Sequence, residues 1–285
     1  MSSLSKAILV TGCSSGIGRA TAIHLAANGH TVYASARRLE SIADLEQHGC
    51  RLLALDVTDE ASRAEAVRAV EAEHGAVGAL VNNAGYSQSG AIETVPLDEV
   101  RRQFETNVFG LVGMCQLVLP AMRAQHYGRI VNVSSMGANF TFPGGGFYHA
   151  TKYAVEAISD ALRFEVKGFG IDVAIIQPGL ITTKFGETAA NAVGETGDEG
   201  PYADFNAKVA QATNDIYVKG PARHLGAGPE AVAKVIERAI TAKSPKIRYR
   251  VTPSAHLLIG QRALLTDGMW DRLMGTQFPR PGAER

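Results

Sequence analysis

The sequence contains few cysteines, and they lie far apart along the chain. Cys13, Cys50 and Cys115 are the three cysteines in 285 residues, with no CxxC pair and no histidine at ligand spacing. Disulfide scaffolds and zinc modules need denser and more closely spaced cysteines. We therefore expect buried thiols in a reducing compartment, no metal site, and a cytoplasmic protein.

An excess of charge of one sign is also missing. Lys+Arg and Asp+Glu both total 28, so the formal net charge is zero. Proteins that bind nucleic acid or an anionic membrane surface usually have a basic balance. This composition therefore predicts neither kind of partner.

Long hydrophobic runs are missing as well. The first apolar run begins after Lys6 and stops at Gly12, which is too short for the core of a signal peptide. No run approaches the ~20 apolar residues that a membrane-spanning helix needs. We expect no membrane span.

What the sequence does contain is a regular alternation of short apolar runs with helical patterns. The expected strands are Ala7–Thr11, Thr31–Ser35, Arg51–Asp56, Ala79–Asn82, Arg129–Ser134, Asp172–Gln177 and Lys246–Val251. The expected helices are 18–28, 41–48, 59–73, 97–125, 149–168 and 229–242. Continuously apolar strands are typical of a parallel sheet that is covered on both faces. The alternation predicts an α/β fold, a Rossmann-type doubly wound parallel sheet of about seven strands with helices on both faces.

The length fits a single domain that spans residues 1–285. The alternation fails between residues 181 and 228, and a connection of this length is usually a functional loop or lid. The tail, residues 252–285, carries several leucines and Trp270. We interpret it as a packed C-terminal extension.

A glycine-rich turn joins the first expected strand to the first expected helix. It reads Thr11-Gly12-Cys13-Ser14-Ser15-Gly16-Ile17-Gly18. Glycines let backbone N–H groups approach a pyrophosphate, and the helix start adds the positive end of its dipole. A turn of this kind between a strand and a helix predicts a dinucleotide site.

The end of the second strand bears on which dinucleotide binds. An NAD site usually has a carboxylate there, whereas this sequence has Ala36 followed by Arg37. A guanidinium suits the 2′-phosphate of NADP, and Ser14 is a second candidate to reach that phosphate. The sequence predicts NADP(H), with NAD as the alternative.

The third strand ends in Asp56, which is followed by Val57. We expect this pair beside the adenine, where the carboxylate could accept a hydrogen bond from the amino group. The competing role for Asp56, capping the next helix, suits Asp59 better.

Four polar residues farther along suit the transfer of a hydride to a carbonyl carbon. Tyr148 and Lys152 are four residues apart in a helical segment and therefore share one face. A neighbouring ammonium favours the phenolate of a tyrosine, whose pKa is otherwise about 10. Ser135, at the end of the preceding strand, can hold the carbonyl oxygen, and Asn107 can hold a water that connects the lysine to solvent.

These motifs resemble the short-chain dehydrogenase/reductase (SDR) family. They are Thr11-Gly12…Gly16-Ile17-Gly18, Asp56, Asn82-Asn83-Ala84-Gly85, Asn107, Ser135, Tyr148…Lys152 and Pro178-Gly179, in the family's order from residue 7 to about 185. The resemblance implies a catalytic tetrad of Asn107, Ser135, Tyr148 and Lys152, with Tyr148 as acid and base and Lys152 also binding the nicotinamide ribose. It further implies a cofactor site made of Gly12, Ser14, Ser15, Gly16, Ile17, Gly18, Arg37, Asp56, Val57, Asn83, Ala84, Gly85, Tyr148, Lys152, Pro178, Gly179, Ile181 and Thr182.

Our hypothesis is an enzyme that moves a hydride between NADP(H) and a carbonyl or secondary alcohol. The Cys13-Ser14-Ser15 turn, the Ala36-Arg37 pair and the long tail look most like the hydroxysteroid and retinol dehydrogenase-like branch of the family. This resemblance implies a bulky apolar substrate such as a steroid, retinoid or lipid ketone. Residues 181–228 would be the substrate-binding loop. Two alternatives are an NAD-linked alcohol dehydrogenase and a non-catalytic module that senses the dinucleotide.

Two further expectations concern features outside the motifs. The family is commonly dimeric or tetrameric, so the resemblance implies a homodimer or homotetramer. His149 follows Tyr148 directly, and we expect it at the helix start or in the pocket wall, with no part in the chemistry.

Overall fold

The computed structural model describes residues 4–183, 200–218 and 224–282. Its strands form one parallel sheet of seven, in the order β3-β2-β1-β4-β5-β6-β7. They are β1 (Ile8–Val10), β2 (Val32–Ala36), β3 (Arg51–Ala54), β4 (Ala79–Asn82), β5 (Gly128–Val133), β6 (Ile171–Gln177) and β7 (Arg248–Arg250). The predicted doubly wound α/β fold is confirmed, and the strand order reverses between β1 and β4. A crevice at the carboxyl ends of the strands is expected at that point.

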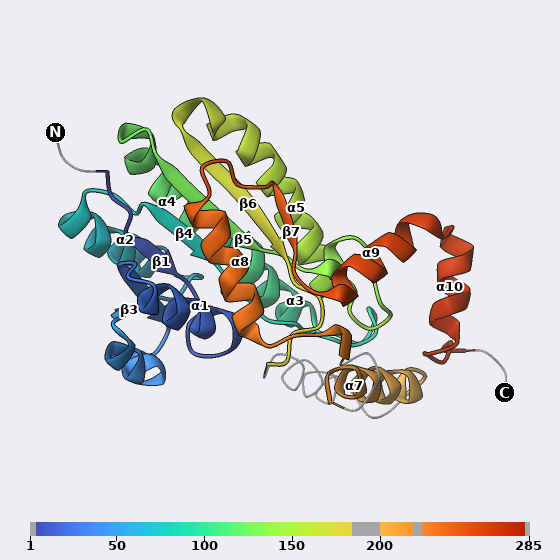
Figure 1. Cartoon of the computed structure of the whole chain (residues 1–285). Helices are drawn as coiled ribbons and strands as arrows, with labels where there is room; N and C mark the ends of the chain where they lie inside the picture. Colours follow the sequence, from blue (N-terminus) through green and yellow to red (C-terminus); the bar gives the residue numbers. More distant parts are fainter. Residues whose placement is uncertain (1–3, 184–199, 219–223, 283–285) are drawn as a thin grey trace.

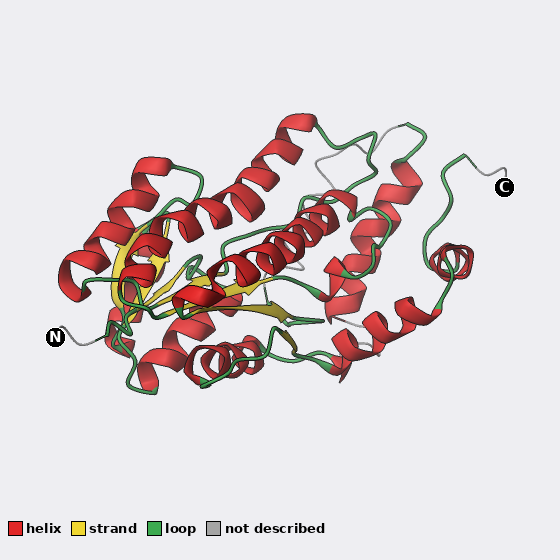
Figure 2. Ribbon diagram, turned by 90° about the horizontal axis from the view of Figure 1, so that it is seen from above, coloured by secondary structure: helices red, strands yellow, loops and turns green. Residues whose placement is uncertain are grey.

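Helices cover both faces of the sheet (Figures 1 and 2). One face packs against α1 (Gly16–Ala27), the 3-10 helix η1 (Leu39–His48) and α8 (Pro229–Thr241). The other face packs against α2 (Glu60–His74), α4 (Gly110–Ala124) and α5 (Gly146–Val166). The remaining elements are α3 (Leu97–Phe104), η2 (Glu105–Phe109), η3 (Met136–Ala138), η4 (Lys167–Phe169), α7 (Ala203–Val218), α9 (Pro253–Leu264) and α10 (Asp267–Gly275).

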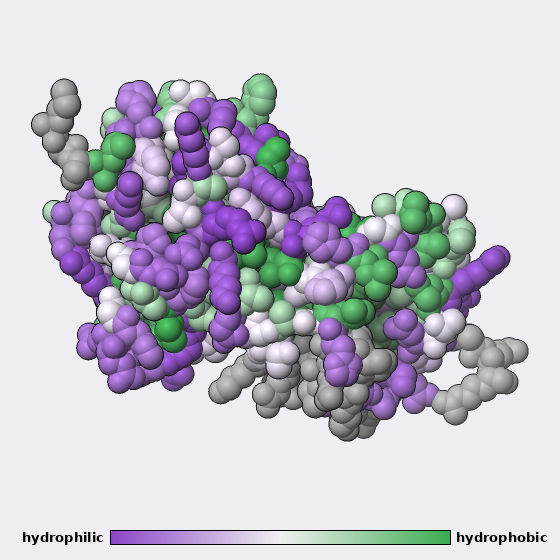
Figure 3. Space-filling model, in the orientation of Figure 1, coloured by the Kyte–Doolittle hydropathy of each residue, from purple (hydrophilic) through white to green (hydrophobic). Residues whose placement is uncertain are grey.

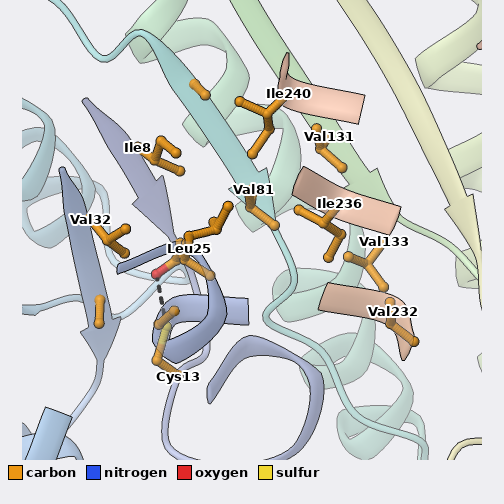
Figure 4. Packing of buried hydrophobic residues seen from close by; sticks show 14 of the residues in the cluster. Ile8, Cys13, Leu25, Val32, Val81, Val131, Val133, Val232, Ile236 and Ile240 are labelled. Atoms are coloured by element: carbon orange, nitrogen blue, oxygen red, sulfur yellow. Dashed lines mark hydrogen bonds between the residues drawn. The ribbon is translucent and has the colours of Figure 1, made fainter. Parts of the chain in front are cut away.

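The first strand shows why the apolar runs are continuous. Successive side chains of a strand point to opposite faces of a sheet. Ile8 and Val10 therefore enter the core under α1 and α8, whereas Leu9 enters the core under α2 and α4. Figure 4 shows the first of these cores, in which the buried Cys13 thiol donates a hydrogen bond to the Val10 carbonyl.

The expected helix 97–125 is one continuous stretch with an irregularity in its middle. It comprises α3, the π-helical turn η2 and α4. By length and composition the segment Leu97–Ala124 is apolar enough to cross a membrane. In the structure, however, Met114, Val118 and Met122 are fully buried under the sheet, so this is a core helix.

Two sequence-based interpretations need correction. The segment 41–48 is a 3-10 helix that begins at Leu39, and the stretch 181–228 contains the helix α7. The α7 helix escapes periodicity analysis because its few buried apolar residues, Phe205 and Val209 among them, are separated by polar ones. Residues 184–199 and 219–223 of that stretch lie outside the described residues.

The expectation that the tail is packed is confirmed. Trp270, Met274 and Phe278 are buried with Phe140 and Phe205 in a third apolar cluster. We call this the cap cluster; it also includes Ala91, Met136, Leu180, Val209, Ala255 and Ile259. It lies apart from the two cores of the sheet, around α7, α9 and α10 (Figure 1).

Candidate active site

A cleft of about 1130 Å³ lies at the carboxyl ends of the strands, where the strand order reverses. Most of the residues predicted from the sequence line it, namely Gly12, Ser14, Ser15, Gly16, Ile17, Arg37, Asp56, Val57, Asn83, Ala84, Gly85, Ser135, Tyr148, Lys152, Pro178, Gly179 and Ile181. Three predicted residues do not line it: Gly18, Asn107 and Thr182, the last being replaced by its neighbour Thr183. The carboxyl-terminal edge of the sheet therefore brings together groups that are far apart in the sequence.

The glycine turn is shaped by close backbone approaches. Gly12 has φ 73° and Gly16 has φ 57°, which side chains other than glycine rarely adopt. A Cβ on Gly18 would lie 2.3 Å from the Gly12 carbonyl oxygen and 2.4 Å from Nδ2 of Asn83. Asn83 in turn donates to the carbonyls of Thr11 (2.9 Å) and Gly12 (3.1 Å). The absence of a side chain at Gly18 and the hydrogen bonds of Asn83 thus hold the turn in this shape.

The start of α1 suits an anion. Its N-cap residue Ser15 makes no side-chain capping bond, so the first N–H groups of the helix lack the usual internal acceptor. Ser15, Gly16 and Ile17, where the helix begins, all line the cleft. A dinucleotide pyrophosphate would satisfy these N–H groups and would meet the positive end of the helix dipole.

The end of the cleft beside β2, where the sequence predicts the adenine half of the dinucleotide, is basic on its rim. Arg37 and Arg38 are exposed directly after β2 and line the cleft, as does Arg102 on α3. Asp56 accepts hydrogen bonds from the amide (2.9 Å) and hydroxyl (2.8 Å) of Thr58. Asp59, as expected, caps α2 through the amide of Ser62.

Tyr148 and Lys152 lie on the first turns of α5 and both line the cleft. The Nζ of Lys152 is 5.8 Å from the centre of the Tyr148 ring and donates to the Val133 carbonyl at 2.9 Å. Burial lowers the pKa of Lys152 to about 8, and the nearby Glu156 carboxylate opposes this shift. An ammonium at this position stabilises a phenolate.

Ser135 occupies the turn between β5 and η3. Its Oγ accepts a hydrogen bond from the amide of Gly137 at 3.0 Å, so its hydroxyl hydrogen is left to donate toward the cleft. The neighbouring Ser134 also lines the cleft but is only 3% exposed. The half-buried Ser135 is therefore the better placed of the two.

Asn107 lies in the π-helical turn η2 and is buried. Its Oδ1 accepts from the Tyr86 amide at 3.0 Å, and its Nδ2 donates to the Tyr86 carbonyl at 2.9 Å and to the Thr151 hydroxyl at 3.1 Å. Asn107 thus ties the segment after Gly85 to α5. Its water contact stays a prediction.

The Pro178-Gly179 segment is held from both sides. The Pro178 carbonyl accepts from the amide of Met136 at 2.8 Å. A Cβ on Gly179 would lie 2.2 Å from the Thr252 hydroxyl and 2.4 Å from that of Ser254. The C-terminal extension therefore supports the wall of the cleft.

The other end of the cleft has an apolar wall that the sequence did not reveal. It is formed by Met136, Phe140, Phe142, Leu180, Val209, Ala212 and Phe278. These residues come from separate segments, and no local pattern marks them. Within the described residues, no group of three or more His, Cys, Asp or Glu is placed to hold a metal.

Comparisons with known proteins agree with this geometry. A family model described as short chain dehydrogenase matches residues 6–193. The chain is 37% identical over 264 residues to a 3-ketodihydrosphingosine reductase of Bacteroides thetaiotaomicron, covering 92% of this chain and 94% of that protein. It is 34% identical over 274 residues to an NADPH-dependent 3-dehydrocapnine reductase of Ornithobacterium rhinotracheale, covering 93% and 94%.

Solved structures show the same fold. A short-chain dehydrogenase from Streptomyces avermitilis matches with a TM-score of 0.76 at 34% identity, covering 96% of this chain and all of that one. A serine dehydrogenase complexed with NADP+ matches with a TM-score of 0.75 at 26% identity, covering 87% and 94%. These relatives favour NADP(H) over the NAD-linked alternative and an enzyme over a sensing module. The chain belongs to the short-chain dehydrogenase family and is an NADP(H)-dependent oxidoreductase.

Proposed function

We propose that the protein reduces a bulky apolar ketone, of the lipid-derived kind, to a secondary alcohol. The observation that carries this proposal is the apolar wall that adjoins Ser135 and Tyr148 in the cleft. Two relatives support it, because their names assign them the reduction of 3-ketodihydrosphingosine and of 3-dehydrocapnine. The sequence alone had left steroid, retinoid and lipid ketones open.

The aromatic rings of the wall pack on one another and on Trp270 behind them. The ring centres of Phe140 and Phe142 are 5.0 Å apart, and that of Trp270 lies 5.6 Å from Phe140 and 6.2 Å from Phe142. Val209 of α7 packs so closely on Gly144 that a Cβ there would lie 2.5 Å from it. A hydrocarbon chain would gain about 0.8 kcal/mol for each CH₂ buried in such a site.

In this proposal the residues of the chain bind the carbonyl oxygen and donate a proton to it. Bound NADPH supplies the hydride that reduces the carbonyl carbon. Ser135 donates a hydrogen bond to the carbonyl oxygen and holds it near Tyr148. Tyr148 gives its phenolic proton to that oxygen as the carbonyl becomes an alcohol, and the Lys152 ammonium stabilises the phenolate that remains.

We propose that two segments bind the substrate: the stretch 181–228 and the C-terminal extension. The stretch 181–228 supplies Val209, Ala212 and Thr213 of α7 to the cleft, and the C-terminal extension supplies Phe278. We propose that the first is the substrate-binding loop and that the second closes its apolar end. Both belong to a single catalytic domain, residues 1–285.

The test is NADPH oxidation with 3-ketodihydrosphingosine and with a short aliphatic ketone. We expect a preference of at least tenfold in kcat/KM for the long-chain ketone. Tyr148→Phe should lower turnover by roughly 10²–10⁴-fold while NADPH still quenches or shifts fluorescence on binding. Equal use of both ketones would contradict the substrate class, and an active Tyr148→Phe variant would contradict the mechanism.

We also propose that the protein assembles into a homodimer or homotetramer. Aromatic side chains remain exposed on the long helices: Phe164 is 83% exposed, Phe109 56% and Tyr153 44%. Burial of such side chains between copies would be favourable. Light scattering after gel filtration should give two or four times 30.2 kDa; a monomer at micromolar concentration would contradict it.

Finally, we propose a cytoplasmic location. Cys13, Cys50 and Cys115 are all buried and free, which suits a reducing compartment. Burial raises the pKa of the Cys13 and Cys115 thiols to about 12, so these thiols are unreactive. Recovery of the protein in secreted or periplasmic fractions would contradict this location.

A further inference from the structure

His149 follows the proposed acid and base directly, yet the mechanism above does not use it. Its side chain is only 6% exposed, and both ring nitrogens are engaged by backbone groups. Nδ1 lies 2.6 Å from the Gly137 carbonyl oxygen, and Nε2 lies 3.2 Å from the Phe142 amide nitrogen. A buried histidine with two specific partners requires an explanation.

The two partners define the state of the ring. A carbonyl can only accept, so Nδ1 carries the hydrogen; an amide N–H can only donate, so Nε2 offers its lone pair. The imidazole is therefore neutral and held in one tautomer. Burial lowers the pKa of His149 in the same sense.

Two glycines make room for this ring. A Cβ on Gly137 would lie 2.6 Å from Nδ1 of His149, and a Cβ on Gly145 would lie 2.9 Å from its Cδ2. Both distances are shorter than side chains tolerate, and the contacts involve a rigid ring. The slot between these two backbones thus fits an imidazole and leaves no room for a side chain on either glycine.

The bonds of this ring extend to both functional parts of the cleft. Gly137 is held by two hydrogen bonds: its carbonyl accepts from His149, and its amide donates to the Ser135 hydroxyl oxygen 3.0 Å away. The Phe142 amide belongs to the apolar wall, in which the Phe142 ring packs on Phe140 and on Trp270. One ring therefore connects the hydroxyl that would hold the carbonyl with the surface that would hold the hydrocarbon.

We propose that His149 is a positioning residue that sets the orientation of Ser135 through Gly137 and the place of the apolar wall through the amide of Phe142. It thereby couples turnover to substrate preference. The inference rests on the proposed function, since it takes Ser135 as the carbonyl-binding group and the wall as the hydrocarbon site.

Two substitutions separate the two bonds. In His149→Asn the side-chain NH₂ can take the place of Nδ1–H and keep the Gly137 bond. In His149→Gln the amide oxygen can take the place of Nε2 and keep the Phe142 bond. We expect His149→Asn to raise the KM of the long-chain ketone roughly tenfold with little change in kcat, and His149→Gln to lower kcat roughly tenfold and keep the preference.

The same kinetics distinguish failure of this inference from failure of the proposed function. A wild-type enzyme without a long-chain preference overturns the function. A wild-type preference combined with equal changes of kcat and KM in both variants overturns the positioning role alone. NADPH titration of each variant checks its fold.

A second pair of variants decides the matter if the histidine variants do not fold. Gly145→Ala adds one methyl group against the ring and leaves the imidazole in place. Gly168→Ala is the matched control, because nothing lies within 4 Å of a Cβ there. We expect Gly145→Ala to lower kcat/KM for the long-chain ketone at least tenfold and Gly168→Ala to leave it unchanged. Equal activities of the two would overturn the proposal.

Discussion

At the scale of one residue, Lys152 shows that a functional group can lower the stability of the fold. Lys152 is 7% exposed, and burial lowers its pKa from 10.5 to about 8. Below pH 8 both the folded and the unfolded chain carry the charge, and the folded chain bears the full desolvation cost. Between pH 8 and 10.5 the unfolded chain binds a proton that the folded chain lacks. Stability therefore rises with pH in this interval.

Lys152→Met should remove this dependence. Relative to the variant, the wild type should gain roughly 3 kcal/mol between pH 7 and pH 10, by the usual 1.36 kcal/mol per pKa unit. Urea unfolding at the two pH values measures it. Lys167→Met is the control, because the Lys167 side chain is 70% exposed. A constant difference between the wild type and Lys152→Met would contradict the desolvation argument.

Arg37 is the residue from which NADP(H) was predicted. Each charge-assisted hydrogen bond from a guanidinium to the 2′-phosphate contributes about 1.5–3 kcal/mol. Arg37→Ala should therefore weaken NADPH binding roughly ten- to a hundredfold and leave NADH binding unchanged. Calorimetric titrations with both dinucleotides measure the ratio.

Arg101→Ala provides the control for that measurement. Its side chain is 65% exposed on α3, pairs with Asp98, and lies outside the cleft lining. An equal loss of NADPH affinity in both variants would indicate a general charge effect. An unchanged ratio of NADPH to NADH affinity in Arg37→Ala would mean that other groups of the rim, such as Arg102, bind the 2′-phosphate.

At the scale of elements, the junction of β1 and α1 requires glycine at position 18 because of a close backbone contact, and not because of helix propensity. Gly18 and Gly260 both lie inside helices, but a Cβ on Gly18 would meet the Gly12 carbonyl at 2.3 Å, whereas a Cβ on Gly260 would meet nothing within 4 Å. Gly260→Ala should stabilise the protein by about 0.5–1 kcal/mol. Gly18→Ala should destabilise it and lower NADPH affinity.

Thermal unfolding and NADPH titration of both variants check this contrast. If Gly18→Ala bound NADPH as tightly as Gly260→Ala, the close packing of α1 on the turn would not be needed for cofactor binding.

The strand and helix around this turn were predicted correctly because continuous apolar runs and glycine spacing are local signals. The π-helical turn at Asn107 was not, since it depends on bonds to Tyr86 and Thr151, which are distant in sequence.

At the scale of the whole molecule, the cap cluster stands apart from the cores of the sheet. Apolar surface gathers over α9 and α10, whereas the face over α1 and α8 is mostly hydrophilic (Figure 3). Leu264 is 86% exposed there and Leu257 57%. The glycine-rich turn and the apolar wall therefore belong to two packing units that meet at the cleft.

Trp270→Ala should separate the two units functionally. Trp270 is 5% exposed, packs on Phe140 and Phe142, and donates to the Thr141 carbonyl. Its removal should cost about 3–5 kcal/mol of packing in the cap. We expect the KM of the long-chain ketone to rise at least tenfold and NADPH affinity to stay within about twofold. Leu264→Ala should change neither, and a parallel loss of NADPH affinity in Trp270→Ala would show one packing unit instead of two.

The sequence by itself determined the parallel sheet, the glycine-rich turn and the spacing of Ser135, Tyr148 and Lys152. Each of these features depends on residues that lie close together along the chain, so periodicity and spacing predict it. Only the tertiary structure decided the helix α7, the apolar wall and the tautomer of His149. These depend on groups such as Phe142, Val209 and Phe278 that meet only after folding, because packing selects partners by shape and not by their order in the chain.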